Sequence, residues 1–577
     1  MGPDRSRPLA VRVTAGRMMA HEQHSVLEPG THDDEEQPPP ATAPERSPRP
    51  RRRWLLPLLV VVLLAQMAAA MVTTAVQQTP TIDEPVYVAT AADYLHEHRV
   101  RLNPEHPPLG KLVIAVGVAI AGPHLDTSYK GDQGQFGRHL LYESGNDPWR
   151  LMFWARLPMI VLTLLFGFVV FAFARELAGA AAGLAALALY VFSPDVIAHG
   201  SLATLDVPAA GCVLTSAWLL WRARRRPRLY VPLAGVALGA GLATKMSVLP
   251  AVPVLLALAA WSVWRAGLEN RRKRAALGAG VAAVAAVAVV WVSYLVVDPR
   301  LRWTPERPVP AVHGLKGLLV RLLPLPASYR DGMRIQFGLE DYPWQGFLFG
   351  HLYTGSRWYY LPAALLVKTP LGMLVLWVAG AAVLLAVRRL RPAAPYVLVP
   401  AGVLLAAAMT GSRDFGTRYA IFVPMFLAVA AGCVLAVRWR WAPLVTAALV
   451  LFVAVSSLLT YPYYLPYSNE AFGGPAKTRL RLHDSNVDWG QDLGRLADRL
   501  HERYRGERIW LVYKGSGVPS YYGIDASDPR QVPPRQVHGL LVVSDSAVAK
   551  ARGRLAALIR SSRPVDDVGH SITVYRR

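Results

Sequence analysis

Residues 54–76 read WLLPLLVVVLLAQMAAAMVTTAV, a run without any charged side chain. Because a helix needs about twenty apolar residues to cross a bilayer, this run predicts a first membrane span. Ten further apolar runs follow, at 157–174, 177–194, 207–221, 229–244, 246–264, 275–297, 361–387, 396–412, 420–437 and 441–460. The sequence therefore predicts an all-α polytopic membrane protein with about eleven transmembrane helices.

The composition supports a membrane protein over a soluble one. Of the 577 residues, 53% are hydrophobic and only 18% are charged, whereas a soluble domain has about 25% charged residues. The net charge is +23, but the basic residues lie in short groups between apolar runs, so we expect no nucleic-acid partner. Cys212 and Cys433 both fall within apolar runs, which excludes a disulfide scaffold and a cysteine-rich metal site.

The distribution of arginine predicts the orientation in the membrane. The groups of basic residues at 49–53, 175, 222–228, 265–274, 388–391 and 438–440 all fall in alternate loops, and the positive-inside rule places these loops in the cytoplasm. We therefore expect a multi-pass plasma-membrane protein with a cytoplasmic N-terminus and an extracytoplasmic C-terminus.

Three domains follow from this pattern. Residues 1–53 mix proline, acidic and basic residues and predict a disordered cytoplasmic segment. Residues 54–460 form the transmembrane domain, with a first external loop at 77–150 and a large external loop at 298–358. Residues 461–577 have ordinary charge density and predict a small extracytoplasmic α/β domain, with helices at 489–504 and 545–560 and strands at 509–513, 540–544 and 572–575.

The first external loop holds the densest group of polar residues. Asp83, Glu84 and Pro85 predict a helix start, with an acidic cap and proline in the first turn. A carboxylate at a membrane interface can also accept a proton from a hydroxyl. Further along, the stretch Glu105-His106-Pro107-Pro108 predicts a rigid turn that holds its two polar side chains in a constant place relative to Lys111.

Several cations lie at or inside the outer ends of predicted spans. Lys368 lies roughly two turns into a span, where an ionised lysine near the helix centre costs about 2.5–3.5 kcal/mol. It predicts an anion-binding group, although its side chain could instead extend to the lipid headgroups. The same alternatives apply to Lys245 in an external turn, and Arg418 beside Tyr419 could bind a donor phosphate or interfacial lipid.

Other acidic residues favour structural roles. Asp206 starts a span, and we expect it to cap a helix rather than to catalyse. The group formed by Asp484, Asn486 and Asp488 does not fit a calcium-binding loop, and it predicts a helix start first and an acceptor contact second. Neither a zinc-binding H-E-x-x-H pattern nor a Walker A sequence occurs, so we expect no metal site, no cofactor and no ATP-driven transport, while a dependence on divalent metal ions stays open.

Five motifs together resemble a known class of membrane enzymes. They are Asp83-Glu84 followed by HPPLGK at 106–111, ARLP at 155–158, WYY at 358–360 with KTP at 368–370, GTRY at 416–419, and DSNVDWGQD at 484–492. In this order the chain resembles the polyprenyl-phosphate-dependent glycosyltransferases of the GT-C class, which include the protein O-mannosyltransferases and the aminoarabinose transferases of lipid A. The resemblance covers most of residues 54–525.

This resemblance implies a reaction at the external face. A sugar would pass from a polyprenyl-phosphate donor in the outer leaflet to an acceptor hydroxyl, with inversion at the anomeric carbon. Asp83 would be the general base and Glu84 its orienting neighbour. The residues implied or expected at the donor sugar and phosphate are Glu105, His106, Lys111, Arg156, Lys245, Lys368, Arg418 and Tyr419. Cations there would stabilise the phosphate that leaves.

An alternative from another functional class is a lipid or small-solute transporter or flippase of the cell envelope. Such a protein would have internal repeats and polar groups at the midplane of the membrane. Here the charged residues that enter the spans gather toward one face, which favours a reaction at the surface. The sugar, the acceptor (protein, lipid or glycan) and the oligomeric state are left open by the sequence.

Overall fold

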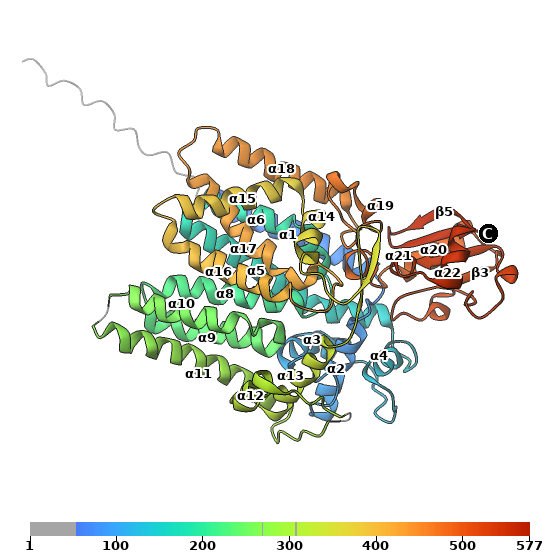
Figure 1. Ribbon diagram of the computed structural model, residues 1–577, viewed down its shortest axis with the longest axis horizontal. Helices are drawn as coiled ribbons and strands as arrows, with labels where there is room; N and C mark the ends of the chain where they lie inside the picture. The colour runs from blue at the N-terminus through green and yellow to red at the C-terminus, as the bar shows by residue number, and fades with distance from the viewer. Residues whose placement is uncertain (1–53, 268, 306–307) are drawn as a thin grey trace, which may run out of the picture. The chain divides into compact units, whose positions relative to one another are not determined.

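The computed structural model describes residues 54–577 except 268, 306 and 307, so the predicted cytoplasmic segment 1–53 lies outside the described residues. The described chain is mostly helical, with small sheets, as predicted. Figure 1 shows long helices running side by side and a sheet near the C-terminus.

All eleven predicted apolar runs are helical. They correspond to α1 (Leu55–Gln77), α5 (Pro148–Ala178), α6 (Ala180–Val191) with α7 (Pro194–Gly200), α8 (Asp206–Ala223), α9 (Pro227–Thr244), α10 (Ala251–Arg265), α11 (Arg271–Val297), α14 (Tyr360–Lys368) with α15 (Leu371–Ala386), α16 (Ala394–Ala408), α17 (Phe422–Gly432) and α18 (Ala442–Thr460). Each predicted apolar run thus contains a helix.

The number of membrane crossings is a separate question. Among the described residues, five helices are long and apolar enough to span a membrane, or six if the bent pair α6–α7 is counted as one span. Several of the others are shorter apolar helices, so the count of eleven stays a prediction. The run 361–387 is broken, because α14 ends just before Pro370, which cannot donate a backbone hydrogen bond. At the end of the run 177–194 the chain continues into α7, which meets α6 at an angle of 62°.

Further elements lie in the predicted external loops. The first loop holds α2 (Glu84–Glu97), α3 (Pro108–Ala121) and α4 (Gln133–Tyr142), and the large loop holds α12 (Gly314–Leu322), α13 (Ala327–Glu340) and a hairpin of β1 (Gln345–Leu348) and β2 (His351–Thr354). The predicted helix start in the first loop is confirmed, because Asp83 is the N-cap residue of α2 and Pro85 lies in its first turn, but the side chain of Asp83 makes no capping hydrogen bond.

The C-terminal region folds around a four-stranded mixed sheet. Its order is β3 (Ile509–Val512), β4 (Leu540–Ser544), β6 (Ile572–Arg576), β5 (Arg563–Val568), in which β3 and β4 are parallel and the other pairs antiparallel. The same region contains four helices: α19 (Pro475–Thr478), α20 (Leu493–Arg503), α21 (Asp545–Ala549) and α22 (Gly553–Arg560) (Figure 1). The predicted helix 545–560 is two helices, and β5 was missed because its polar residues do not alternate clearly.

A backbone pairing joins this C-terminal region to the start of the first loop. The amide of Thr79 donates to the carbonyl of Gln491 and the amide of Ile82 donates to the carbonyl of Trp489, both at 3.0 Å. Ser516 adds a side-chain hydrogen bond to the carbonyl of Thr81 at 2.9 Å. The C-terminal region therefore packs directly on the four residues that precede Asp83.

Candidate active site

A cavity of about 890 Å³ lies where α2, α8, α13 and the C-terminal region meet. One part of its wall is apolar and comes from α8, α16 and the start of α17, with Ala209, Ala210, Val213, Leu404, Ala407, Ala408, Ile421 and Phe422. The remaining wall is rich in charged side chains. Predicted site residues in this wall are Asp83, Glu105, His106, Asp206, Lys245, Arg418, Tyr419 and Asp484.

Asp83 meets Arg418 in this cavity. The guanidinium of Arg418 donates to Oδ2 of Asp83 at 2.6 Å, and the side chains are 9% and 28% exposed. The same guanidinium lies 4.3 Å from the ring centre of Trp489, a cation–π contact, and donates to the hydroxyl of Tyr419 at 3.2 Å. Two motifs that are 335 residues apart in sequence thus form one site.

Asp206 and Lys245 form a second ion pair in the cavity wall. Nζ of Lys245 lies 2.5 Å from Oδ1 of Asp206, and the ammonium also lies 5.5 Å from the ring centre of Tyr419. Asp206 is the first residue of α8, in the first turn where the prediction places it. Its carboxylate also pairs with Lys245, so its role extends beyond the helix start.

The Glu105–His106 turn also reaches the cavity. Glu105 accepts a hydrogen bond from Gln133 at 2.7 Å, and His106 packs edge-on against the ring of Tyr87. Burial, followed by the positive charges of Lys245 and Lys111, holds the pKa of His106 well below its usual range. His106 is therefore uncharged near neutral pH and cannot supply a positive charge to a phosphate.

Lys111 lies behind this turn and is not in the cavity lining. Its ammonium donates to the backbone carbonyls of Asn103 and His106 at 2.8 and 2.7 Å. Asn103 itself has a positive φ of 52°, a conformation that asparagine tolerates better than most residues. Lys111 thus holds the turn in shape, which is a different role from the predicted contact with the donor.

Glu84 and Arg156 form a fully buried pair beside the cavity. Nε and Nη2 of Arg156 each donate to the carboxylate at 2.7 Å, and the side chains are 1% and 0% exposed for Arg156 and Glu84. Arg156 also donates to the carbonyls of Ala75, Gln78 and Thr79 at the end of α1. Neither residue lines the cavity, so the structure does not place Arg156 where the predicted phosphate contact would require it.

Lys368 is likewise enclosed rather than presented to a ligand. Its ammonium lies 3.3 Å from Oδ1 of Asp195 and donates to the carbonyls of Leu465 and Asn486 at 2.5 and 3.1 Å. Asn486 in turn accepts from the amide of Thr417 at 3.0 Å. These contacts join α14 to the C-terminal region, and neither Lys368 nor Asn486 lines the cavity.

The 484–492 stretch is largely buried between the membrane helices and the sheet. Asp488 accepts hydrogen bonds from the amides of Gly490 and Ser546 at 3.2 Å each, and burial raises its pKa to about 7. Asp484 forms an ion pair with Lys514, which with its other contacts holds the pKa of Asp484 at about 2 despite burial. The expected helix start lies at the end of this stretch, where Asp492 is the N-cap residue of α20, whereas Asp484–Asn486 form only a short 3-10 turn.

Sequence reasoning missed several charged residues of the cavity. Arg413 forms an ion pair with Glu340 at the end of α13, and Lys514 and Lys550 enter the wall from the C-terminal region. The first pair lies in loops whose charges look ordinary. Lys514 follows the predicted strand 509–513 and Lys550 lies within the predicted helix 545–560, in a segment of normal charge density where a lysine usually faces solvent.

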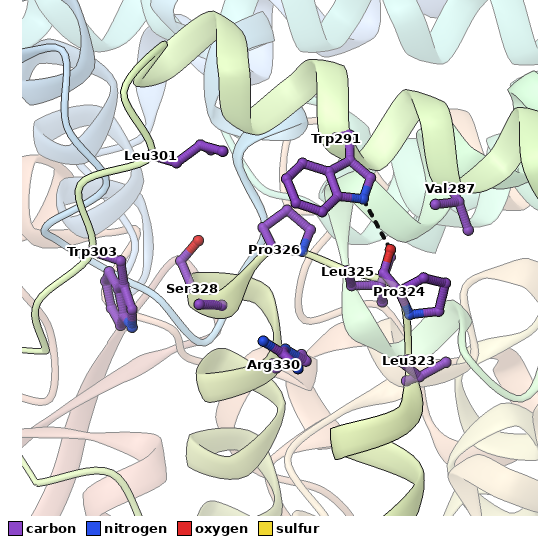
Figure 2. A pocket seen from close by; sticks show the side chains of 11 residues that line it. Val287, Trp291, Leu301, Trp303, Leu323, Pro324, Leu325, Pro326, Ser328 and Arg330 are labelled. Carbon is purple, nitrogen blue, oxygen red and sulfur yellow. Dashed lines mark hydrogen bonds between the residues drawn. The ribbon is translucent and has the colours of Figure 1, made fainter.

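A second cavity, of about 550 Å³, differs in character. It lies between α11 and the segment that connects α12 to α13, and Trp291 donates to the carbonyl of Pro324 at 2.9 Å. Figure 2 shows its mainly apolar lining, in which Arg330 is the single charged side chain. It lacks the paired carboxylates and cations of the larger cavity, which is therefore the candidate active site.

In the part of the chain that the structure describes, no group of three or more histidine, cysteine or acidic side chains is arranged to hold a metal ion. Six cationic side chains line the candidate site: Lys245, Lys316, Arg413, Arg418, Lys514 and Lys550.

Several solved structures resemble this chain at low sequence identity. Solved structures that resemble the chain include apo ArnT from Cupriavidus metallidurans (16% identity, 89% of this chain and 97% of the other, TM-score 0.42) and the apo oligosaccharyltransferase of Archaeoglobus fulgidus (13%, 89% and 73%, 0.47). The Pmt1-Pmt2 complex of S. cerevisiae, a protein O-mannosyltransferase, matches at 18% identity over 42% of this chain and 33% of the other, with a TM-score of 0.34. No curated protein matches.

One protein-family model matches part of the sequence. Residues 60–298 match the model of the dolichyl-phosphate-mannose-protein mannosyltransferase family, a stretch that holds Asp83, the turn at 105–106, Asp206 and Lys245. The resemblance to the GT-C glycosyltransferases that the sequence motifs predict is thereby confirmed, and the chain carries the pattern of this family over residues 60–298.

Proposed function

We propose that the protein is a membrane glycosyltransferase that moves a sugar from a polyprenyl-phosphate donor to an acceptor hydroxyl on the extracytoplasmic side. The observation that carries the proposal is the cavity in which Asp83 lies with Arg418 and Lys245. The family matched by residues 60–298 is described by a lipid-phosphate sugar, dolichyl-phosphate mannose, which supports the same class of donor.

The two ends of the cavity suit the two parts of such a donor. The apolar wall comes partly from α16, which is among the helices able to span a membrane. An isoprenoid chain would lie against this wall because contact with apolar side chains removes it from water. The phosphate would then lie at the edge of the apolar wall, near Lys245 and Arg418.

Asp83 has the geometry of a general base. Its Oδ2 atom is held by Arg418, and among the described residues no side chain or amide donates to Oδ1. The acceptor O–H would give its proton to Oδ1 while the acceptor oxygen attacks the anomeric carbon. The bond between that carbon and the phosphate oxygen breaks, and polyprenyl phosphate leaves with the bonding electrons.

The leaving phosphate gains negative charge as this bond breaks. Cations that are already fixed in a partly dehydrated site stabilise such charge more than water does. Lys245 and Arg418 are fixed by their carboxylates Asp206 and Asp83, so they are held in place before the reaction. Inversion at the anomeric carbon follows from a single displacement of this kind.

The test is turnover of a synthetic polyprenyl-phosphate mannose by the full-length protein in lipid nanodiscs, with release of polyprenyl phosphate as the readout. We expect Asp83→Asn to lower turnover by at least about 100-fold, because positioned general bases contribute about 10²–10⁴-fold. Binding of polyprenyl phosphate should change by only a few-fold, since the cations remain.

Glu97→Gln is the matched control, because Glu97 is an exposed carboxylate at the other end of α2. It should leave both turnover and thermal stability unchanged. Near-normal turnover by Asp83→Asn would remove this residue from the role of base. Binding of polyprenyl phosphate without any turnover by the wild-type protein would favour the alternative of a lipid transporter or flippase.

A further inference from the structure

The C-terminal region contributes two lysines to the wall of the candidate active site. Lys514 follows β3 and Lys550 follows α21, and both are partly buried and line the cavity. Lys514 forms an ion pair with Asp484. These lysines come from the C-terminal region, whereas the apolar wall comes from α8, α16 and the start of α17.

Lys550 lacks a matching negative charge. Within residues 54–577 other than 268, 306 and 307, no carboxylate lies within ion-pair distance of its ammonium, which lies 5.2 Å from the ring centre of Phe415. Burial, and after it the positive charge of Lys514, lowers the pKa of Lys550. Two ammonium groups thus share the neighbourhood of a single carboxylate, Asp484.

Such an arrangement favours an anion. A partly buried ammonium group is unfavourable unless a negative charge or hydrogen-bond acceptor compensates it. A phosphate or carboxylate between the two lysines would supply that charge and would accept charge-assisted hydrogen bonds from both. The aromatic ring of Phe415 beside the ammonium would exclude water and strengthen these bonds.

We propose that Lys514 and Lys550 form a subsite for an anionic group, a phosphate or a carboxylate, carried by the acceptor. The inference rests on the proposed function, which assigns the apolar wall and the cations Lys245 and Arg418 to the lipid donor. Because the two lysines enter from the C-terminal region instead, the anion that they hold belongs to the molecule that arrives from outside the membrane. The acceptor class is therefore an anionic hydroxyl compound rather than a neutral one.

The first experiment measures binding of inorganic phosphate to the full-length protein in detergent micelles by ³¹P NMR titration. We expect Lys514→Gln and Lys550→Gln each to weaken binding by about tenfold, since a hydrogen bond to a charged group contributes roughly that factor. Lys550→Arg should retain binding. Lys477→Gln removes an exposed lysine of α19 and should bind phosphate as the wild type does.

The second experiment measures hydrolysis of polyprenyl-phosphate mannose by the same variants. If the anion belongs to the acceptor, the substitutions should raise the KM for this donor by much less than the tenfold loss of phosphate affinity. A tenfold rise in the donor KM for both lysine variants would assign the lysines to the donor phosphate and overturn the proposal. Unchanged phosphate affinity in Lys550→Gln would overturn it as well.

The two experiments separate failure of this inference from failure of the proposed function. Lysine-dependent phosphate binding in a protein that never turns over the donor would contradict the glycosyltransferase while supporting an anion site. Donor turnover with phosphate binding that ignores both lysines would support the glycosyltransferase and contradict the subsite.

Discussion

Breaking the buried pair of Glu84 and Arg156 is expected to destabilise the protein by about 3–5 kcal/mol, the usual cost of leaving one member of such a pair without its partner. The carboxylate accepts five hydrogen bonds: two from Arg156, two from the amide and hydroxyl of Thr81, and one from the amide of Ala203. In Glu84→Gln, the NH₂ group of the new side chain would point at N–H groups that donate to the carboxylate in the wild type, and those donors would lose their acceptor. The positive charge of Arg156 would also stay buried without a counter-charge.

The opposite single substitution should cost a similar amount for a second reason. Arg156 donates to three carbonyls at the end of α1, between Ala75 and Thr79, and helix ends leave such carbonyls without partners inside the helix. Arg156→Met would leave these carbonyls and the carboxylate of Glu84 unpaired. The doubly substituted Glu84→Leu/Arg156→Met protein contains no buried charge at this place, so it should lose much less than the sum of the single losses.

The assay is equilibrium unfolding in detergent micelles, followed by tryptophan fluorescence, for the wild type, both single variants and the double variant. Turnover of polyprenyl-phosphate mannose, measured on the folded fraction, reports the position of Asp83 separately. Single losses below about 1 kcal/mol, or a double loss equal to the sum of the singles, would refute the reasoning. Either result would mean that the pair is not coupled as its geometry indicates.

Two further predictions concern buried charges elsewhere. Burial raises the pKa of Asp545 to about 6, so between about pH 4 and pH 6 the folded protein binds more protons than the unfolded chain, and stability falls as the pH rises through this window. Asp545→Asn, which keeps an acceptor for the hydroxyl of Thr573, should flatten that slope in Tm measured from pH 4 to pH 7.5, and an unchanged slope would contradict the assignment. Lys368→Met should lower unfolding free energy by about 3–5 kcal/mol, because Asp195 would stay buried without its partner, and the added substitution Asp195→Asn should restore part of the loss in the same denaturation assay.

Much of the fold could be predicted because its main signal is one-dimensional. A helix in lipid must be apolar along its whole length, so the eleven apolar runs could be read directly, and all are helical. The breaks could not be read as easily. The interruption at Pro370 divides a run that looked continuous, and the short helix after the bend at Pro194 lies beyond the end of its run. The length of a run says little about how a broken helix packs.

The candidate site could be predicted only in part, because partners lie far apart in sequence. Asp83 and Arg418, which belong to two of the motifs, and Lys245, which lies in a predicted external turn, all line one cavity. No sequence pattern indicated that Arg156 would form an ion pair with Glu84, which lies 72 residues away in the sequence. Lys368 has the sequence pattern of a ligand-binding lysine, a single charge within an apolar run. A charge inside the membrane needs a partner, but the sequence does not show whether that partner is a ligand or another residue of the protein.

The adjacent carboxylates Asp83 and Glu84 show how such a site is built. Asp83 is the N-cap of α2 and Glu84 is its first helical residue, so the two side chains leave the backbone in different directions. Glu84 turns inward and ties the start of α2 to the end of α1 through Arg156, while Asp83 faces the cavity and Arg418. The buried pair of Glu84 and Arg156 is joined by two hydrogen bonds and cannot shift without losing several hydrogen bonds. Glu84 therefore fixes the position of Asp83. The Asp-Glu motif therefore combines a positioning residue with a residue that can meet the substrate, and substitution of Glu84 should affect turnover through the place of Asp83 rather than through contact with the sugar.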